Sequence, residues 1–479
     1  MTAPVVAPRR VHFVGICGAA VSGAALLAQQ LGYRVSGSDE GAVPPTTDML
    51  TRAGIPWVNR FDAANLDHNG VPDLVVVANT VRTGNPEWQA ATARGLAVTS
   101  EAELYAELTR DRLRIAVCGT HGKTTTAALL AWMLDQAGLQ PGFRLGAVSR
   151  DFGESARLGA GAPFVFEGDE YTTAPWDSRP KFLHVRPQLA CVTRMELDHP
   201  DVYPDFDAYQ APFIELARAM PEDGLLALGT QDEAVVALAA AASCPTVLYG
   251  EDVRAGWRIE AGATGDGGGV PQRFTVHRPD APPLQVAMSA PGAHHRHDAT
   301  AALLLAAAAG ADVERCAAAC GSFVGAARRW QVVGSAAGVS VVDDHTDHPT
   351  EVAVTLSAAR EQRRGGRILA VFTPHTYSRT LRLLDAYEHC FDAADVVVLG
   401  PLDPARERDQ PALVSSEDVA ARVRRGGAGE VHVVADAAAA ALMASRRARS
   451  GDLVLCLSVN GFDGVAQRVL AALEGGDGR

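Results

Sequence analysis

Short apolar runs alternate with longer alanine-rich or amphipathic stretches along most of the chain. Such runs suit strands that are buried on both faces, and the stretches between them suit helices. The clearest strand-like runs are Val11–Val14, Arg34–Gly37, Leu74–Val77, Leu113–Val117, Phe164–Phe166, Leu189–Val192, Val339–Val342, Ile368–Phe372, Val396–Leu399 and Leu453–Leu457. Strands that alternate with helices in this way predict an α/β protein with mostly parallel sheets.

The length of the chain and the positions of these runs predict three domains. The chain has 479 residues, which is enough for about three domains of ordinary size. We predict a Rossmann-like N-terminal domain at 1–110, a central P-loop ATPase domain at 111–328 and a Rossmann-like C-terminal domain at 329–479. The glycine-rich piece at 262–269 is predicted to be a turn between strands, without chemistry of its own.

Composition narrows the class of protein and of partner. Apolar residues make up 47% of the chain and charged residues 21%, with a net charge of -13. An acidic chain without a basic patch is not expected to bind nucleic acid, because phosphate backbones reward lysine and arginine. No apolar run is long enough to span a membrane, and Met1–Arg10 has no apolar signal region. Eight scattered cysteines without a CxxC pair indicate reduced core thiols, so we expect a cytoplasmic protein.

A glycine-rich turn indicates a nucleoside triphosphate site. The run Gly119-Thr120-His121-Gly122-Lys123-Thr124-Thr125 follows an apolar strand and precedes the helix-like stretch Ala127–Leu134. Its backbone amides and helix N-terminus suit phosphate, Lys123 suits the outer phosphates, and Thr124 suits Mg²⁺. A standard P-loop has glycine where Val117 stands, so this is a shortened form. The alternative is a tight strand–helix turn with a chance lysine, and the hydroxyl run after Lys123 favours the nucleotide site.

Two further strand-like runs end in acidic residues. Phe164–Phe166 leads into Glu167-Gly168-Asp169-Glu170, and Leu189–Val192 leads to Glu196-Leu197-Asp198-His199. Carboxylates crowded at a strand end repel one another unless a cation or hydrogen bonds compensate them. A solvated acidic turn and a structural histidine are the alternatives, but the P-loop in the same segment favours Mg²⁺ with a nucleotide.

The N-terminal segment carries a second candidate ligand site. A glycine-rich turn at Gly15 and Gly18 follows the first strand, and Asp39 follows the second. The third strand leads into a polar loop that contains Asn79 and Arg82. Loops at the carboxyl ends of strands in open α/β sheets commonly face ligands. The glycine spacing is not the dinucleotide fingerprint, so tight strand–helix packing stays an alternative.

Taken in order, these motifs resemble the Mur ligases over nearly the whole chain. The motifs are Gly-Thr-His-Gly-Lys-Thr-Thr, Glu167-Gly168-Asp169-Glu170, Asp198-His199, Arg328-Arg329, and Asp344 with His348-Pro349-Thr350. The resemblance implies ATP-dependent joining of a UDP-N-acetylmuramoyl carboxylate to an amine. Pro374-His375-Thr376-Tyr377 resembles the branch that adds L-alanine, whereas Thr83-Gly84-Asn85-Pro86 and Asn460-Gly461-Phe462 resemble the branch that reattaches a released tripeptide.

The resemblance also implies roles for individual residues, with ATP and Mg²⁺ as cofactors. The implied catalytic residues are Lys123, Glu170, His199, Arg329 and Asp344. Those implied for the nucleotide are Gly119, Thr120, His121, Gly122, Lys123, Thr124, Thr125, His295, Arg329 and Asp344. Those implied for the metal are Thr124, Glu170 and His199. Those implied for the substrates are Gly15, Gly18, Asp39, Asn79, Arg82, His348 and Arg379.

Four polar positions depart from the family pattern and leave the substrate open. Arg194, His295 and Asp298 stand where the family usually has asparagine, and Asp347 stands where it has histidine. His295 can offer adenine one hydrogen bond but not the paired donor and acceptor of an amide. The alternatives are a diverged ligase of specialised metabolism and a nucleotide-binding homologue without turnover. We expect small-molecule substrates as partners, and a monomer or a homodimer.

Overall fold

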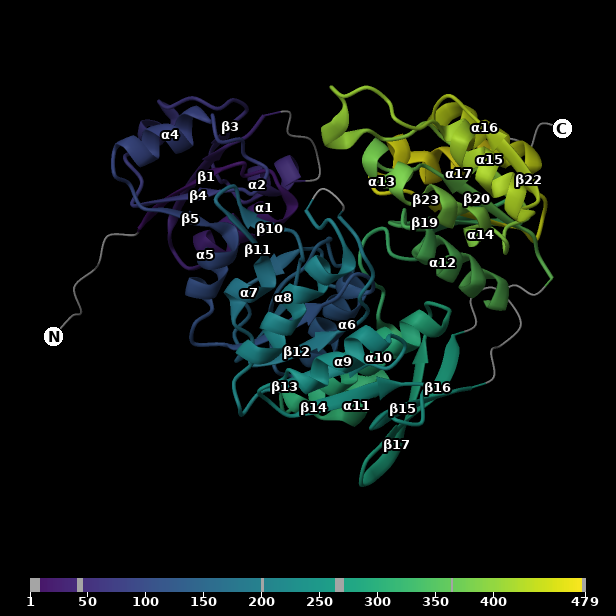
Figure 1. Cartoon of the computed structure of the whole chain (residues 1–479), viewed down its shortest axis with the longest axis horizontal. Helices are drawn as coiled ribbons and strands as arrows, with labels where there is room; N and C mark the ends of the chain where they lie inside the picture. Colours follow the sequence, from purple (N-terminus) through teal and green to yellow (C-terminus); the bar gives the residue numbers. More distant parts are fainter. Residues whose placement is uncertain (1–8, 41–45, 200–201, 263–270, 363–364, 476–479) are drawn as a thin grey trace. The chain divides into compact units, whose positions relative to one another are not determined.

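The computed structural model describes residues 9–40, 46–199, 202–262, 271–362 and 365–475 (Figure 1). Its contacts group into two compact units. The N-terminal unit comprises Met1–Leu197, Pro204–Arg258 and Ala299–Ala319, and the C-terminal unit comprises Asp198–Tyr203, Ile259–Asp298 and Cys320–Arg479. The domain boundaries predicted at 110 and 328 stay a prediction. Most of the predicted glycine-rich turn at 262–269 lies outside the described residues.

The N-terminal unit begins with a five-stranded parallel sheet in the order β3-β2-β1-β4-β5. Its elements are β1 (Arg10–Val14), α1 (Ala19–Gln30), β2 (Arg34–Ser38), α2 (Thr46–Arg52), β3 (Trp57–Val58), α3 (Asn65–His68), β4 (Leu74–Val77), α4 (Pro86–Ala93), β5 (Val98–Ser100) and α5 (Glu101–Leu108). All four residues of β4 are buried, as expected for a strand with helices on both faces. The carboxyl ends of these parallel strands lie at one edge of the sheet.

The strands around the P-loop belong to a second sheet, in which they lie in the order β15-β14-β13-β12-β6-β9-β7-β8. All neighbours pair in parallel except β7 and β8. The elements of this region are β6 (Leu113–Cys118), α6 (Lys123–Gln136), β7 (Gly142–Arg144), β8 (Ala156–Arg157), β9 (Pro163–Glu167), β10 (Thr172–Ala174), β11 (Asp177–Pro180), α7 (Lys181–Val185), β12 (Leu189–Val192), α8 (Phe206–Ala219), β13 (Leu225–Gly229), α9 (Glu233–Ala237), β14 (Thr246–Gly250), β15 (Trp257–Ala261), α10 (Ala293–Ala308) and α11 (Val313–Ala319). β10 and β11 form a separate antiparallel hairpin.

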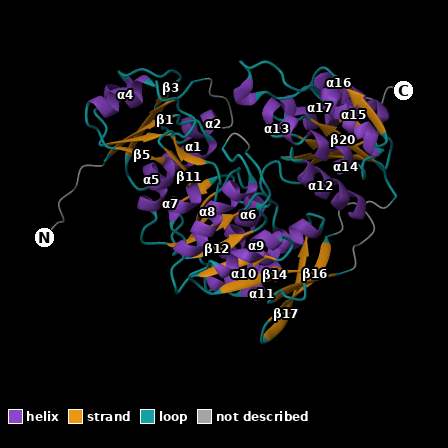
Figure 2. Ribbon diagram, in the orientation of Figure 1, coloured by secondary structure: helices purple, strands orange, loops and turns teal. Residues whose placement is uncertain are grey.

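The C-terminal unit contains a six-stranded sheet in the order β18-β19-β23-β20-β21-β22, in which only β18 is antiparallel to its neighbour. Figure 2 shows β20 in orange among purple helices. Its elements are the hairpin β16 (Gln272–Arg278) and β17 (Ala281–Met288), then β18 (Gln331–Ala336), β19 (Val339–Asp344), α12 (Pro349–Gln362), β20 (Ile368–Phe372), α13 (Tyr377–Arg382), α14 (Tyr387–Cys390), β21 (Val396–Leu399), α15 (Ser416–Gly426), β22 (Glu430–Val433), α16 (Ala437–Arg447), β23 (Leu453–Leu457) and α17 (Val465–Glu474).

Strand β20 shows how an apolar run builds two cores at once. Ile368, Ala370 and Phe372 pack with α12, α14 and α15 on one face of the sheet. Leu369 and Val371 pack with α16 and α17 on the other face. Successive side chains of a strand point to opposite faces, so a run without polar residues requires helices on both sides.

The structure confirms the predicted α/β class and the mostly parallel sheets. The predicted strands Leu189–Val192, Ile368–Phe372, Val396–Leu399 and Leu453–Leu457 match β12, β20, β21 and β23 in both bounds. The helix after the P-loop begins earlier than predicted, at Lys123, because Gly122 takes the left-handed φ of 81° as its N-cap. No helix among the described residues is long and apolar enough to cross a membrane.

Candidate nucleotide and substrate sites

The turn between β6 and α6 has the geometry of a phosphate-binding loop. Gly119 has φ +120°, and a Cβ there would lie 2.3 Å from Thr193 Oγ1 and 2.8 Å from Arg194 O. Only glycine fits this approach. The Thr120 amide donates to Arg194 O at 2.6 Å, so the loop is fixed by the neighbouring strand end through backbone atoms. The N-terminus of α6, a 14-residue helix, therefore opens on a rigid turn.

Lys123 is held at the mouth of this loop. Its ammonium donates to Gly119 O at 2.7 Å and to Thr120 O at 3.0 Å, and it lies 2.8 Å from Glu170 Oε2. Burial alone would lower the pKa of Lys123, but Glu170, Glu167 and Asp169 raise it above its ordinary value. A lysine that stays charged beside backbone amides can neutralise transferring phosphate oxygens.

The acidic end of β9 supplies oxygen ligands that suit Mg²⁺. The Thr124 hydroxyl donates to Glu167 Oε1 at 2.8 Å, and the Gly146 amide donates to Glu167 Oε2 at 2.6 Å. A hydroxyl and carboxylates are the hard ligands that Mg²⁺ takes beside nucleotide phosphates. The donor set therefore fits the metal, with Glu167 next to Thr124 and Glu170 next to Lys123.

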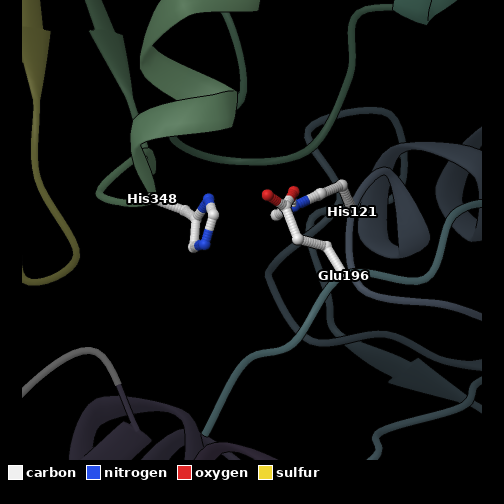
Figure 3. Close-up of side chains that lie close together, drawn as sticks. All are labelled: His121, Glu196 and His348. Carbon is white, nitrogen blue, oxygen red and sulfur yellow. Dashed lines mark hydrogen bonds and ion pairs between the residues drawn. The ribbon is translucent and has the colours of Figure 1, made fainter. Parts of the chain in front are cut away.

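The start of the P-loop is tied to the end of β12. The Thr120 hydroxyl lies 2.7 Å from the Tyr209 hydroxyl and donates to Glu196 O at 3.0 Å. His121 Nε2 lies 2.9 Å from Glu196 Oε2, and in Figure 3 this ring nitrogen points at that carboxylate. Glu196 therefore orients the imidazole of His121, which the resemblance assigns to the nucleotide.

Behind the acidic strand end lies a group of four charged side chains that the sequence did not reveal. This charged quartet consists of Glu101, Arg144, Asp169 and Lys181. Arg144 Nη2 is 3.1 Å from Glu101 Oε1, and Lys181 Nζ is 2.9 Å from Asp169 Oδ2 and 3.6 Å from Glu101 Oε2. Burial would raise the pKa of Asp169, yet Lys181 and Arg144 hold it well below its ordinary value. Arg144 also donates to Glu167 O at 3.1 Å.

The sequence contained one signal for this quartet. Of the 43 lysine and arginine residues, only Lys123 and Lys181 are lysines. Lys123 and Lys181 contact neighbouring acids of the same strand end, Glu170 and Asp169. Because all other basic residues of this kind are arginines, the two lysines could have marked the site in the sequence.

The substrate residues predicted in the first sheet lie at its carboxyl edge. Gly15, Asp39 and Asn79 follow the adjacent strands β1, β2 and β4. Gly15 has φ +85°, and a Cβ there would lie 2.7 Å from Ala78 Cβ. Gly18 is the N-cap of α1, and Arg82 is exposed in the loop before α4. The order of strands changes direction between β1 and β4, and such a switch point is where open α/β sheets bind ligands.

Asp39 is already engaged at this edge. Its Oδ2 accepts from the Cys17 amide at 2.7 Å, and burial raises its pKa above the ordinary value. It therefore fixes the glycine-rich turn after β1.

In the C-terminal unit, Asp344 and Arg329 are positioned around the carboxyl end of β19. Asp344 Oδ2 accepts from the Trp330 amide at 2.6 Å, and Oδ1 accepts from the Thr346 hydroxyl. Burial raises the pKa of Asp344. Arg329 Nη1 donates to His345 O at 2.8 Å. The neighbours Arg328 and Trp330 have φ of 58° and 43°, which is uncommon for residues with a side chain.

His295 is a neutral hydrogen-bonding group near the start of α10. Its Nδ1 lies 2.6 Å from Pro291 O, a carbonyl that can only accept, so Nδ1 carries the proton. Burial lowers the pKa of His295 to about 4. Nε2 is then an acceptor at neutral pH and can take one hydrogen bond from a donor.

The residues expected near the amine form a charged cluster in the C-terminal unit. Arg379, on α13, pairs with Asp347 Oδ2 through Nη1 and with Asp198 Oδ2 at 2.9 Å through Nη2. His348 is 2% exposed, and its Nδ1 accepts from the Thr350 amide at 3.2 Å. His199 has φ 56°, and its amide donates to Asp198 Oδ1 at 2.7 Å. The pairing of Asp347 with Arg379 was not predicted, because the two lie in different motifs.

Three family models match successive parts of the chain. They are described as the Mur ligase family catalytic domain at residues 10–113, the Mur ligase middle domain at 117–306 and the Mur ligase glutamate ligase domain at 328–459.

Curated relatives match over nearly their whole length. The UDP-N-acetylmuramate–L-alanyl-γ-D-glutamyl-meso-2,6-diaminoheptandioate ligase of Haemophilus influenzae is 34% identical over 97% of this chain and 99% of its own length. The UDP-N-acetylmuramate–L-alanine ligase of Halorhodospira halophila is 37% identical over 98% of this chain and 95% of its own length. The crystal structure of a murein peptide ligase from Psychrobacter arcticus covers 97% of this chain and 99% of its own, with 29% identity and a TM-score of 0.72. With the P-loop, the acidic strand ends and the three matched domains, this similarity shows that the chain belongs to the Mur ligase family.

Proposed function

We propose that this protein is an ATP-dependent ligase that joins the carboxylate of UDP-N-acetylmuramate to the amino group of an amino acid or peptide. The observation that carries the proposal is the contact set of Lys123. Its ammonium lies between the loop carbonyls of Gly119 and Thr120 and the carboxylate of Glu170. The names of both curated relatives, which contain UDP-N-acetylmuramate, support the choice of acid.

The chemistry needs the carboxylate to gain a leaving group. A carboxylate oxygen attacks the γ-phosphorus of ATP, the bond to ADP breaks, and an acyl phosphate forms. The amine then attacks the acyl carbon and loses a proton. Phosphate leaves with the former carboxylate oxygen. Lys123 stabilises the charge on the transferred group, while the rigid loop amides hold the phosphates in place.

Mg²⁺, when bound, would neutralise negative charge on the phosphates. We propose Thr124 and Glu170 as its ligands, with Glu167 holding the Thr124 hydroxyl in position. His199, Arg329 and Asp344 are assigned to the same reaction from the resemblance.

The remaining roles follow the same proposal. Gly119, Thr120, His121, Gly122, Thr125 and His295 bind the nucleotide. Gly15, Gly18, Asp39, Asn79 and Arg82 bind the UDP moiety, and His348 and Arg379 border the amine. The partners are small molecules, and the oligomeric state we propose is a monomer or a homodimer in the cytoplasm. Similarity to two peptidoglycan ligases over 97% and 98% of the chain supports this function over a specialised ligase or a homologue without turnover.

Phosphate release tests the proposal. With ATP, Mg²⁺ and UDP-N-acetylmuramate, we expect release only when an amine such as L-alanine or an L-alanyl peptide is added. Lys123→Ala should reduce the rate at least about hundredfold while circular dichroism stays unchanged. Arg425→Ala, at an exposed cation of α15, is the matched control. Release that does not depend on acid and amine, or that survives Lys123→Ala, would contradict the proposal.

A further inference from the structure

Arg379 stands where a ligand carboxylate would be expected to bind. It lies on α13, which follows β20, and β19 and β20 both run parallel to β23. Ligands of open α/β sheets bind beyond the carboxyl ends of such strands. A guanidinium also matches a carboxylate through two parallel hydrogen bonds. An unpaired arginine at this place would therefore favour an amine that carries a free carboxylate beside its amino group.

In this chain both terminal nitrogens of Arg379 are already taken by carboxylates. Nη1 contacts Asp347 and Nη2 contacts Asp198. The three side chains are 14%, 8% and 8% exposed, so water screens the pairing little. His375 Nδ1 lies 3.9 Å from the same Asp347 oxygen, and the Tyr387 hydroxyl donates to the Asp347 carbonyl at 3.4 Å. Asp347 is thus fixed from several sides in its contact with Arg379.

The balance of charge around Arg379 is negative. Burial would lower the pKa of Arg379, but Asp347, Asp198 and Glu351 raise it above its ordinary value. One guanidinium therefore pairs with two carboxylates, Asp347 and Asp198. A third carboxylate, from a free amino acid, would meet this surplus of negative charge and would have to displace Asp347 or Asp198. An ammonium or a neutral amide meets no such repulsion.

We propose that Asp347 is a specificity-determining residue that occupies Arg379 and selects an amine whose neighbouring carboxyl group is masked in an amide, as at the N-terminus of a peptide. This inference rests on the proposed function. The names of the two relatives frame the choice. The relative from Halorhodospira halophila is named for L-alanine, and the relative from Haemophilus influenzae is named for an L-alanyl peptide. The two amines differ in whether the carboxyl group of the alanine is free.

The test compares L-alanine with L-alaninamide, which differ only at that carboxyl group. Wild-type protein should use L-alaninamide and the L-alanyl tripeptide with a higher kcat/KM than L-alanine. Asp347→Asn removes the charge but keeps the shape, and it should shift the ratio of kcat/KM values at least tenfold toward L-alanine. Asp347→Glu, which keeps the charge, and Asp392→Asn, at an exposed acid of the same unit, should leave the ratio unchanged.

The outcomes separate the two proposals. If no amine supports phosphate release by the wild-type protein, the proposed function fails. The ratio of the dissociation constants of the two amines is then measured by equilibrium binding to wild type and variant. Asp347→His serves in place of Asp347→Asn if that variant does not fold. In either assay, a ratio that is the same in wild type and variant overturns the role of Asp347, as does wild-type protein that prefers L-alanine.

Discussion

Lys181→Met removes one of the two lysines of the chain and tests the charged quartet. In the wild type, the Lys181 ammonium lies 2.9 Å from Asp169 and 3.6 Å from Glu101. Its side chain is 11% exposed, and those of Asp169 and Glu101 are 30% and 4% exposed. Methionine keeps the length and apolar stem of the side chain. The substitution therefore removes the charge and leaves two carboxylates to share Arg144 alone.

The expected cost follows from breaking a buried ion pair by removing one partner. Such changes cost about 3–5 kcal/mol. The partial exposure of Asp169 puts the expected loss in the free energy of unfolding at the low end, about 3 kcal/mol. Lys181→Arg keeps the charge and should cost less. Arg425→Met, at a pair whose arginine side chain is 61% exposed, should cost about 1 kcal/mol or less.

The pH dependence of this loss has a definite sign. Lys181 and Arg144 lower the pKa of Asp169 in the folded protein. A carboxylate with a lowered pKa stabilises the fold above its unfolded pKa of about 3.9, and this contribution is lost as the pH falls through the folded pKa. The difference between wild type and Lys181→Met should therefore be full at pH 7 and shrink below about pH 4.

Chemical unfolding by urea measures the stability, and the Mg²⁺ concentration for half-maximal phosphate release measures the effect on the site. Asp169 belongs to the same turn as Glu170 and Glu167. Once it is released, the Mg²⁺ concentration required should rise several-fold, which a purely structural loss of stability would not cause. A Lys181→Met protein within about 0.5 kcal/mol of wild type, with the same Mg²⁺ dependence, would refute the reasoning.

Three further predictions address other parts of the molecule. Gly119→Ala should destabilise the fold by about 2 kcal/mol or more in urea unfolding, because its Cβ would lie 2.8 Å from Arg194 O at a φ of +120°; an unchanged midpoint would contradict the loop geometry. Burial lowers the pKa of His295 to about 4 in the folded protein, so between about pH 6.5 and 4 the unfolded chain binds a proton that the folded protein does not. The free energy of unfolding should therefore fall by about 3 kcal/mol as the pH falls through this range. His295→Asn should remove this pH dependence. If the free energy of unfolding of wild type and His295→Asn depends on pH in the same way, the effect of His295 is contradicted. UDP-N-acetylmuramate at a hundredfold excess over its dissociation constant should stabilise the protein by about 2.7 kcal/mol in a thermal shift assay, and a shift with Mg²⁺ and ATP alone would favour a different acid.

The strands and the P-loop could be predicted because their signals are local. A run such as Ile368–Phe372 is apolar at every position, and only a strand covered on both faces buries it without a break. The motif Gly119–Thr125 combines glycines for a tight turn, a lysine and hydroxyl groups within a few residues. Its place between a strand and a helix could therefore be predicted from the motif itself.

The pairings within the site could not be predicted because they join residues that are distant in sequence. Glu101 and Lys181 belong to α5 and α7, and Asp347 and Arg379 belong to different motifs. The periodicity of apolar residues and the spacing of motifs do not show which acidic residue forms an ion pair with which basic residue. The sequence marked Asp347 as a departure from the family pattern, but only the structure shows that it occupies Arg379.

The most direct test of ATP-driven amide formation follows an oxygen atom. UDP-N-acetylmuramate labelled with ¹⁸O in its carboxylate is incubated with ATP, Mg²⁺ and an L-alanyl amine, and the released phosphate is analysed by mass spectrometry. An acyl phosphate requires that each turnover moves one carboxylate oxygen into phosphate. We therefore expect labelled phosphate in equal amount to the amide product. Unlabelled phosphate would show that water, and not the carboxylate, attacks ATP, and it would contradict the proposed function.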